Sequence, residues 1–377
     1  VVVTDDAKLD ASGEAGGGEI HVGGALRGEG ELYTAMYTFV GPDAVLDASA
    51  TVHGDGGTII VWADVATYFG GEARARGGDQ GGNGGFIELS GAHELYVPGD
   101  YDAAAPHGQA GTVLFDPMDV IIRGGSGDGS DVNFTSLTTD PGRSNSETLV
   151  DHIDTSTDPD TVWIDFITAP RAGSGANPFI IYESEIESRA GNVIIIEAGR
   201  SIGTQGTFSN DTLTIDGQFV LGTRNDAGDG AGNIDLTGST AGDNLIIALS
   251  GAGNFIEVTG GHSAQLTSNV ILPTIQAASG ASVYVGSATG SVSLRGPINV
   301  ATGGEAQFAG HVDVNIENAI TTDDGGVAVW AGRDVIFSGA AADITTTSGA
   351  VDIAADAQIS WLLLDFDVLY NSQMSQS

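Results

Sequence analysis

The sequence of 377 residues predicts an all-β fold, a parallel β-helix in which short strands stack coil upon coil. Three observations support this prediction: glycine accounts for 58 residues, helical periodicity is nearly absent, and a short strand preceded by glycines returns along the chain. A solenoid of strands needs many tight corners. Glycine adopts the positive φ angles of such corners at low energetic cost, so the composition and the repeats agree.

The strand after each glycine pair alternates inward and outward side chains, as a half-buried strand does. Of the steps between its first four copies, the first is clearly longer than the two that follow. The predicted inward positions are, copy by copy, Ile20 and Val22, Ile59 and Val61, Ile87 and Leu89, and Val113 and Phe115. The outward positions form two columns, one of Glu19, Thr58, Phe86 and Thr112 and one of His21, Ile60, Glu88 and Leu114.

Similar strands follow in the second half of the chain, at 190–199, 211–217, 231–238, 241–251, 281–287, 290–296, 325–332 and 349–356. Many steps are near 20 residues, or near half or twice that number, which predicts about 19 coils and a rod of roughly 90 Å at about 4.8 Å per coil. The alternative is a sandwich of antiparallel hairpins. It requires Asn-Gly or Asp-Gly turns between paired strands, and these are few.

The repeats predict a division of the chain into four parts. Residues 1–122 and 190–360 are predicted as β-helix repeats. Residues 123–189 form an irregular segment rich in Ser, Thr, Asp and Pro, whose one plausible helix is 146–153 with Ser146 as N-cap. Residues 361–377 hold an apolar cluster unlike the coils, and are predicted to cap the last coil or to contact a neighbouring subunit.

Residues 30–42 are predicted to form an extra-helical strand or hairpin. The first step of the repeat, from Glu19 to Thr58, is longer than the second, and Tyr33, Tyr37 and Phe39 alternate within the additional stretch. Such an element would cover outward apolar side chains that otherwise make a large exposed patch. These side chains are Ile60, Trp62, Phe86 and Leu114.

The charge and the absence of cysteine exclude several classes of function. The chain has 50 Asp and Glu against 12 Lys and Arg, a net charge of −38, so it repels nucleic acid and offers no basic patch to anionic lipid. Without cysteine there are no disulfides and no thiolate chemistry. The longest apolar runs are too short to span a membrane as a helix.

The stretch from Ala44 to Ile122 contains, in order, DASA, GDGG, VWAD, ARGG, GNGGF and DP. In this combination it resembles the filamentous-haemagglutinin family of large exported proteins of Gram-negative bacteria. The resemblance implies a right-handed parallel β-helix, two-partner secretion through an outer-membrane pore, and an adhesive surface or released fibre. The family's N-terminal secretion domain has no counterpart here, which implies that the chain is a piece of a longer protein.

Candidate sites are weak, and no catalytic, cofactor-binding or metal-binding residue is predicted. Gly199–Gly203 matches G-x-S-x-G, but a strand rather than a helix follows, which predicts a coil corner. The acidic pairs Asp323 with Asp324 and Asp154 with Asp158 are the places where a carbohydrate-active enzyme would keep its carboxylates. Such pairs are expected by chance in so acidic a chain.

Calcium and glycan sites are also only weakly indicated. The runs 124–131 and 225–233 are similar to Gly-Asp calcium repeats, but each occurs singly, so solvated acidic turns are favoured over a weak Ca²⁺ site. Sequons begin at Asn133 and Asn210. The histidines show no ligand spacing; they are His21, His53, His93, His107, His152, His262 and His311.

Together these observations lead us to expect an exported surface or extracellular fibre protein of a Gram-negative bacterium. Its expected role is structural and adhesive, in cell attachment, biofilm or aggregation, with an unidentified cell-surface or matrix ligand. The alternative is a self-assembling filament or matrix subunit held by end-to-end contacts, and a carbohydrate-active β-helix enzyme is the third possibility.

Overall fold

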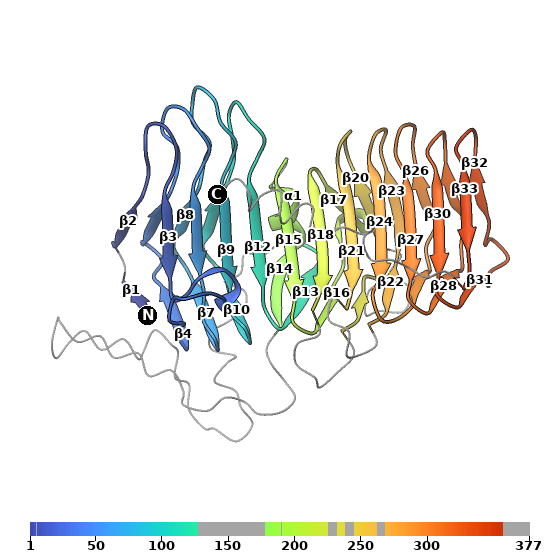
Figure 1. Cartoon of the computed structure of the whole chain (residues 1–377), viewed down its shortest axis with the longest axis horizontal. Helices are drawn as coiled ribbons and strands as arrows, with labels where there is room; N and C mark the ends of the chain where they lie inside the picture. The colour runs from blue at the N-terminus through green and yellow to red at the C-terminus, as the bar shows by residue number, and fades with distance from the viewer. Residues whose placement is uncertain are drawn as a thin grey trace, which may run out of the picture.

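The computed structural model describes residues 1–4, 6–126, 178–189, 191–224, 232–237, 245–261 and 268–356. In these ranges the chain is nearly all β, and its strands form long parallel sheets. Within the sheets the strands follow each other in one row from the N-terminal to the C-terminal end (Figure 1). This architecture is consistent with an all-β parallel solenoid.

The longest sheet, sheet I, contains eleven described strands. In spatial order they are β3 (Glu19–Val22), β6 (Thr58–Val61), β9 (Phe86–Ser90), β12 (Thr112–Asp116), β15 (Val193–Ala198), β18 (Gln218–Thr223), β21 (Phe255–Gly260), β24 (Ser282–Ser287), β27 (Ala306–Gly310), β30 (Val327–Ala331) and β33 (Val351–Ala354).

Four further sheets form the other sides of the stack. Sheet II has the order β14 (Phe179–Tyr182), β13 (Asp119–Arg123), β16 (Ser201–Gln205), β19 (Ile234–Asp235), β22 (Val270–Leu272), β25 (Val292–Leu294), β28 (Asp313–Ile316) and β31 (Asp334–Phe337). Sheet III has the order β17 (Thr212–Ile215), β20 (Ile246–Leu249), β23 (Thr274–Ala277), β26 (Ile298–Val300), β29 (Ile320–Thr322) and β32 (Ile344–Thr346).

The N-terminal part has two shorter sheets in place of sheets II and III. Sheet IV contains β1 (Val2–Val3), β4 (Tyr37–Val40), β7 (Ala66–Phe69) and β10 (Glu94–Tyr96). Sheet V contains β2 (Lys8–Asp10), β5 (Val45–Asp47), β8 (Glu72–Arg74) and β11 (Asp100–Asp102). The helical elements of the described residues are the short helix α1 (Glu183–Glu187) and the 3₁₀ turns η1 (Leu26–Gly28) and η5 (Ser209–Asp211).

Every strand pair of the described residues is parallel, which excludes the sandwich of antiparallel hairpins. A coil consists of three strands, one from each side. The estimate of about 19 coils is wrong, because the described coils are longer than about 20 residues: the first strands of sheet I begin at Glu19, Thr58, Phe86 and Thr112. Ten steps along sheet I at about 4.8 Å give about 48 Å instead of about 90 Å.

The inward columns of the first four copies are confirmed. Ile20 pairs with Ile59, Ile59 with Ile87, and Ile87 with Val113. The same column continues along sheet I to Val327 and Val351, and its members between the two ends are buried. Side chains of one column thus stack directly on each other, and this continuous apolar interior holds the coils together.

Chain order and spatial order differ at one place, where β13 and β14 exchange positions. β13 pairs with β16 on one side and with β14 on the other, and β14 in turn lies against β10. β14 therefore occupies the layer that follows β10. In the chain, however, it comes after β13 and after the long stretch between Arg123 and Phe179. At this level α1 takes the place of a strand between β14 and β15.

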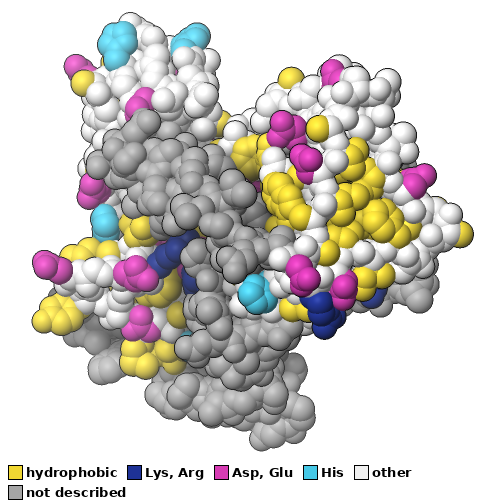
Figure 2. Space-filling model, turned by 45° about the vertical axis from the view of Figure 1, so that its right-hand side comes forward, with side chains coloured by type: hydrophobic (Ala, Val, Ile, Leu, Met, Phe, Trp, Pro, Cys, Tyr) yellow, Lys and Arg dark blue, Asp and Glu magenta, His cyan; other side chains and the backbone are white. Residues whose placement is uncertain are grey.

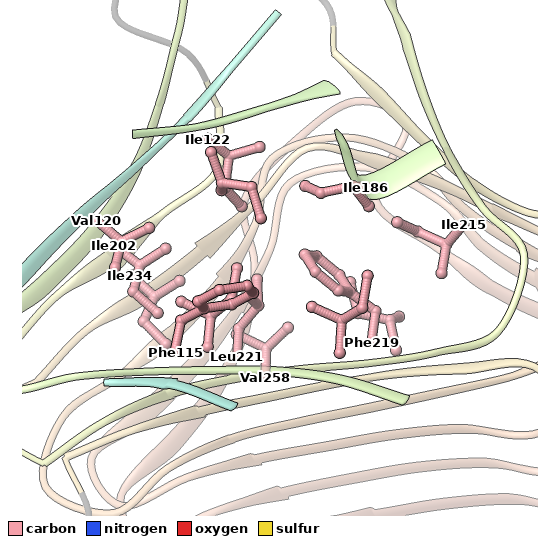
Figure 3. Close-up of a cluster of buried hydrophobic side chains, with 14 of the residues drawn as sticks. Phe115, Val120, Ile122, Ile186, Ile202, Ile215, Phe219, Leu221, Ile234 and Val258 are labelled. Carbon is pink, nitrogen blue, oxygen red and sulfur yellow. The ribbon is translucent and has the colours of Figure 1, made fainter. Parts of the chain in front are cut away.

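Figure 3 shows the core at this level. Val120 and Ile122 of β13 lie with Ile202 and Ile234 on one side, and Ile186 of α1 points into the same interior from another. On the polar side of the helix, Glu183 accepts hydrogen bonds from the backbone N–H groups of Gly125 at 2.6 Å and Ser209 at 2.9 Å. These bonds fix the helix in the coil.

The expectation of an extra-helical element at residues 30–42 is corrected. Tyr37–Val40 is β4, an ordinary member of sheet IV between β1 and β7. Its alternating aromatic residues suit a stacked strand, and Phe39 stacks on Tyr68 with ring centroids 5.0 Å apart. The segment that covers the outer face of sheet I lies earlier, at residues 23–28.

Two predicted segments lie outside the described residues: the helix at 146–153 with Ser146 as N-cap, and the cap or contact segment 361–377. The segment 123–189, predicted to be irregular, is described only at its two ends. Its C-terminal end contains β14 and α1. None of the helices in the described ranges combines the length and the apolar content that a membrane-spanning helix needs.

Candidate functional site

Three carboxylates lie side by side on the outer face of sheet I. Glu88 of β9, Asp116 of β12 and Glu197 of β15 come from neighbouring strands, because β12 pairs with both β9 and β15. Their side chains point away from the solenoid core, since the residue before each of them belongs to an inward column. All three residues are nevertheless buried, with exposed fractions of 0%, 0% and 3%.

Part of the cover is a short stretch, residues 23–28, which we call the covering loop. Two of its glycines lie against the indole of Trp62: a Cβ at Gly24 would be 2.8 Å from Trp62 Cδ1, and one at Gly28 would be 2.5 Å from Trp62 Cε2. Arg27 and Gly28 have φ angles of 56° and 67°. Glycine permits both the close approach and the left-handed backbone at Gly28, so the loop lies flat on the sheet.

Arg27 ties the covering loop to the carboxylates. Its backbone N–H donates to both carboxyl oxygens of Glu88, at 3.0 and 3.2 Å, and its guanidinium pairs with Glu197. Arg224, which directly follows β18, pairs with Asp116, and its Nη1 lies 3.6 Å from Glu197 Oε2. Two guanidiniums and three carboxylates thus form one cluster that spans the covering loop, three successive strands of sheet I and the residue that follows the fourth strand.

Burial and repulsion between carboxylates raise the pKa values of Glu88 and Asp116. Burial, with a smaller contribution from the charge of Asp116, raises the pKa of Glu88 from 4.5 to about 8. Burial also raises the pKa of Asp116, against the opposing effect of Arg224. The guanidiniums of Arg27 and Arg224 offset the negative charge of the cluster. This balance makes a buried cluster of five ionisable groups tolerable.

Apolar contacts accompany the ionic ones. Leu26 of the covering loop packs against a second hydrophobic cluster on the outer face of sheet I, formed by Leu114, Val193, Ile195 and Val220. The predicted outward patch thus exists, and its members Ile60, Trp62 and Leu114 are buried. The whole arrangement fastens the N-terminal loop across several coils. In this conformation the carboxyl groups of Glu88, Asp116 and Glu197 are closed off from solvent.

The G-x-S-x-G match lies at a coil corner between two strands. Gly199 and Arg200 connect β15 to β16, and Ser201 is the first residue of β16. The Ser201 hydroxyl donates to Asp119 at 2.6 Å, and Arg200 donates to the same carboxylate at 2.9 Å. A nucleophile elbow needs a helix after the serine, whereas this serine is followed by a strand.

The acidic pair Asp323 and Asp324 accepts hydrogen bonds from the corner of the neighbouring coil. Asp324 accepts from the backbone N–H of Gly303 at 2.6 Å, and Asp323 accepts from the Thr302 hydroxyl at 3.1 Å. The other pair, Asp154 and Asp158, is outside the described residues. So are residues 127–131 and 225–231 of the two candidate calcium runs.

Among the described residues no three His, Cys, Asp or Glu side chains are grouped so that they could hold a metal ion. Asn210 is exposed in η5, and Asn133 is outside the described residues. His152 and His262 are also outside them. The remaining histidines are exposed at separate places along the stack: His21, His53, His93, His107 and His311.

Sequence reasoning missed the cluster around Arg27. Glu88 stood in a predicted outward column beside Ile60 and Leu114, and a carboxylate between two apolar residues was a signal for a covered site. The partners could not be found, because Arg27 and Glu197 are 170 residues apart. No protein-family model matches the chain, and no curated protein sequence matches it.

Proposed function

We propose that this chain is a rod-like part of an exported fibre on the surface, or in the surroundings, of a Gram-negative bacterium. Its fold is a right-handed parallel β-helix, and its role is structural and adhesive. In this role it presents the long sides of the stack to a cell-surface or matrix ligand and reaches the exterior through an outer-membrane secretion pore.

The observation that supports this proposal most directly is the constant register of sheet I. Eleven described strands follow each other in parallel, with inward columns that continue from one end to the other. Such a stack is stabilised by contacts between neighbouring coils, so its length can change without loss of the fold. That property suits a fibre that must carry a binding surface away from a cell.

Electron microscopy and a binding assay test the two halves of the proposal. Immunogold labelling of the producing cells should place the chain on surface fibres or in the extracellular matrix. Beads coated with the purified chain should adhere to matrix proteins or cell-surface glycans more strongly than beads coated with the heat-denatured chain. Label confined to the cell interior, or equal adhesion of both kinds of bead, would contradict the proposal.

The second candidate is a self-assembling filament or matrix subunit. It needs an end that another molecule can reach, and the last coil of β31, β32 and β33 has exposed apolar side chains of this kind. Analytical ultracentrifugation over a hundredfold range of concentration separates the two candidates. A filament subunit should form a concentration-dependent series of polymers, whereas the fibre proposal expects one sedimenting species in the absence of divalent cations.

In either role the chain catalyses no reaction. The carboxyl groups with raised pKa are closed under the covering loop, and Asp324 is engaged in the hydrogen bond that holds a coil corner. Incubation with neutral and acidic polysaccharides should release no reducing ends beyond those released by the boiled chain. Release above that background, lost on Asp116→Asn, would instead assign a carbohydrate-active function to the cluster.

A further inference from the structure

The C-terminal end of the stack exposes its apolar interior. Val351 and Ile353 of β33 are 41% and 47% exposed, and Phe337 of β31 is 46% exposed. Figure 2 shows hydrophobic side chains gathered into one patch at this end, with acidic side chains around it. We call the surface formed by β31, β32 and β33 the end face.

The other end of the same columns is different. Ile20 and Val22 of β3 occupy the first positions of the columns that end in Val351 and Ile353, and they are only 6% and 4% exposed. Inside the stack Val329, the direct partner of Ile353, is fully buried. The end face is therefore exposed because no described layer covers the last residues of columns that are buried elsewhere.

We propose that the chain's own segment 361–370, WLLLDFDVLY, covers the end face as one additional strand. The segment lies outside the described residues. The sequence LDFDV alternates Leu364, Phe366 and Val368 with Asp365 and Asp367, the pattern of a strand with one apolar and one charged face. The apolar face would meet the side chains of β33 and β31, and the two aspartates would point to solvent.

Length and position favour this occupant. The last described residue, Asp356, is two residues beyond the end of β33, so the described part of the chain ends beside the end face. The stretch from Asp356 to Leu364 can reach about 26 Å at about 3.3 Å per residue, enough to turn back across the end of a coil. It is much shorter than an ordinary coil in this part of the chain, which runs from Val327 to Val351.

The composition of the segment indicates a cover and not a further coil. Residues 357–377 contain no glycine, whereas the coil corners of this chain depend on glycine. Charged residues on an edge strand prevent another strand from pairing with it, and Asp365 and Asp367 would have this effect. A second copy stacked in the same direction is a poorer occupant, because Ile20 and Val22 of its first coil are already buried.

Engineered disulfides test this proposal cleanly, because the chain has no cysteine of its own. Ile353→Cys is combined in turn with Leu364→Cys, Phe366→Cys or Val368→Cys. Under mild oxidation at least one pair should close within one molecule, at a rate that dilution does not change and more than ten times that of the control pair Val2→Cys with Phe366→Cys. Val2 is an exposed apolar residue at the opposite end of the stack.

Hydrogen exchange gives a second readout that needs no cross-link. In the double variant Leu364→Asp, Phe366→Asp the amides of residues 351–354 should exchange at least tenfold faster than in the unmodified chain. The matched variant Asp365→Asn, Asp367→Asn should leave their exchange unchanged. Failure of all three cysteine pairs, disulfides that join only two separate molecules through position 353, or equal exchange in both double variants would overturn the proposal. The outcome is independent of whether the fibre is adhesive.

Discussion

At the scale of single residues, Glu88 holds a carboxyl group where water cannot reach it. Its exposed fraction is zero, and the backbone N–H of Arg27 donates to both of its oxygens. Its pKa of about 8 lies above the ordinary value of 4.5. A raised pKa in the folded state contributes stability that is fully present below pH 4.5 and is lost as the pH rises through 8.

Glu88→Gln should therefore change the dependence of stability on pH. Glutamine keeps an oxygen for the Arg27 N–H and carries no charge at any pH. The melting temperature of the variant, relative to the unmodified chain, should rise steadily between pH 5 and pH 8. The exposed Glu305→Gln, directly before β27 of the same sheet, serves as control and should show a much smaller change with pH. A Glu88→Gln difference that does not change with pH would contradict the protonated buried carboxyl.

Arg27→Ala should destabilise the fold by about 3 kcal/mol, because it leaves the buried Glu197 without its closest counter-charge. Arg74→Ala is the matched control. Arg74 pairs with Glu72 at the surface, with side chains 40% and 37% exposed, and such pairs contribute less than about 1 kcal/mol. Urea unfolding of both variants measures the difference. Equal losses of stability would show that the Arg27 cluster is no stronger than a surface ion pair.

At the scale of elements, the covering loop depends on glycine for its close contact with Trp62. Gly28→Ala should displace the loop, because its Cβ would meet the indole at 2.5 Å. The expected result is an increase of at least tenfold in the hydrogen exchange of residues 23–29. Gly30→Ala is the control: Gly30 also has a positive φ, 99°, but its nearest neighbour would be 3.9 Å away. If both variants exchange alike, backbone strain and not the contact with Trp62 holds the loop.

The elements also show what the sequence could predict. Alternation identified the inward columns of sheet I, because burial of Ile59, Ile87 and Val113 imposes a period of two on a strand. It could not assign strands to sides: 211–217 and 231–238 read alike, yet β17 belongs to sheet III and β19 to sheet II. The side depends on how many residues each corner uses, and corners of Gly, Asn and Asp vary in length without a periodic signal.

At the scale of the whole molecule, the sequence did not reveal the spatial order of the strands. β13 and β14 pair in parallel although a long stretch of chain separates Arg123 from Phe179, and β14 fills the layer before β13. Nothing in either strand distinguishes this order from the ordinary one, since both alternate apolar side chains in the same way. The covering element was predicted at residues 30–42 instead of 23–28 for a related reason. Aromatic alternation at Tyr37 and Phe39 fits a stacked strand as well as an external hairpin.

The net charge of −38 governs how whole molecules meet. Carboxylates spread along a stack repel neighbouring stacks at low ionic strength, and Lys8 is the only lysine that could offset them. Divalent cations can bridge carboxylates of two molecules, whereas monovalent ions only screen them. Millimolar Ca²⁺ or Mg²⁺ should therefore raise the mass seen by light scattering, and chelation should reverse the increase.

The control for this association is sodium chloride at the same ionic strength, which should leave the scattering mass nearly unchanged. The covering loop offers an internal comparison, because its ionic cluster is buried and should not respond to added cations. Hydrogen exchange of residues 23–29 should thus stay constant while the mass rises. Association that sodium chloride induces equally well would mean that screening alone brings the stacks together, and lateral contact would then depend on their apolar surfaces.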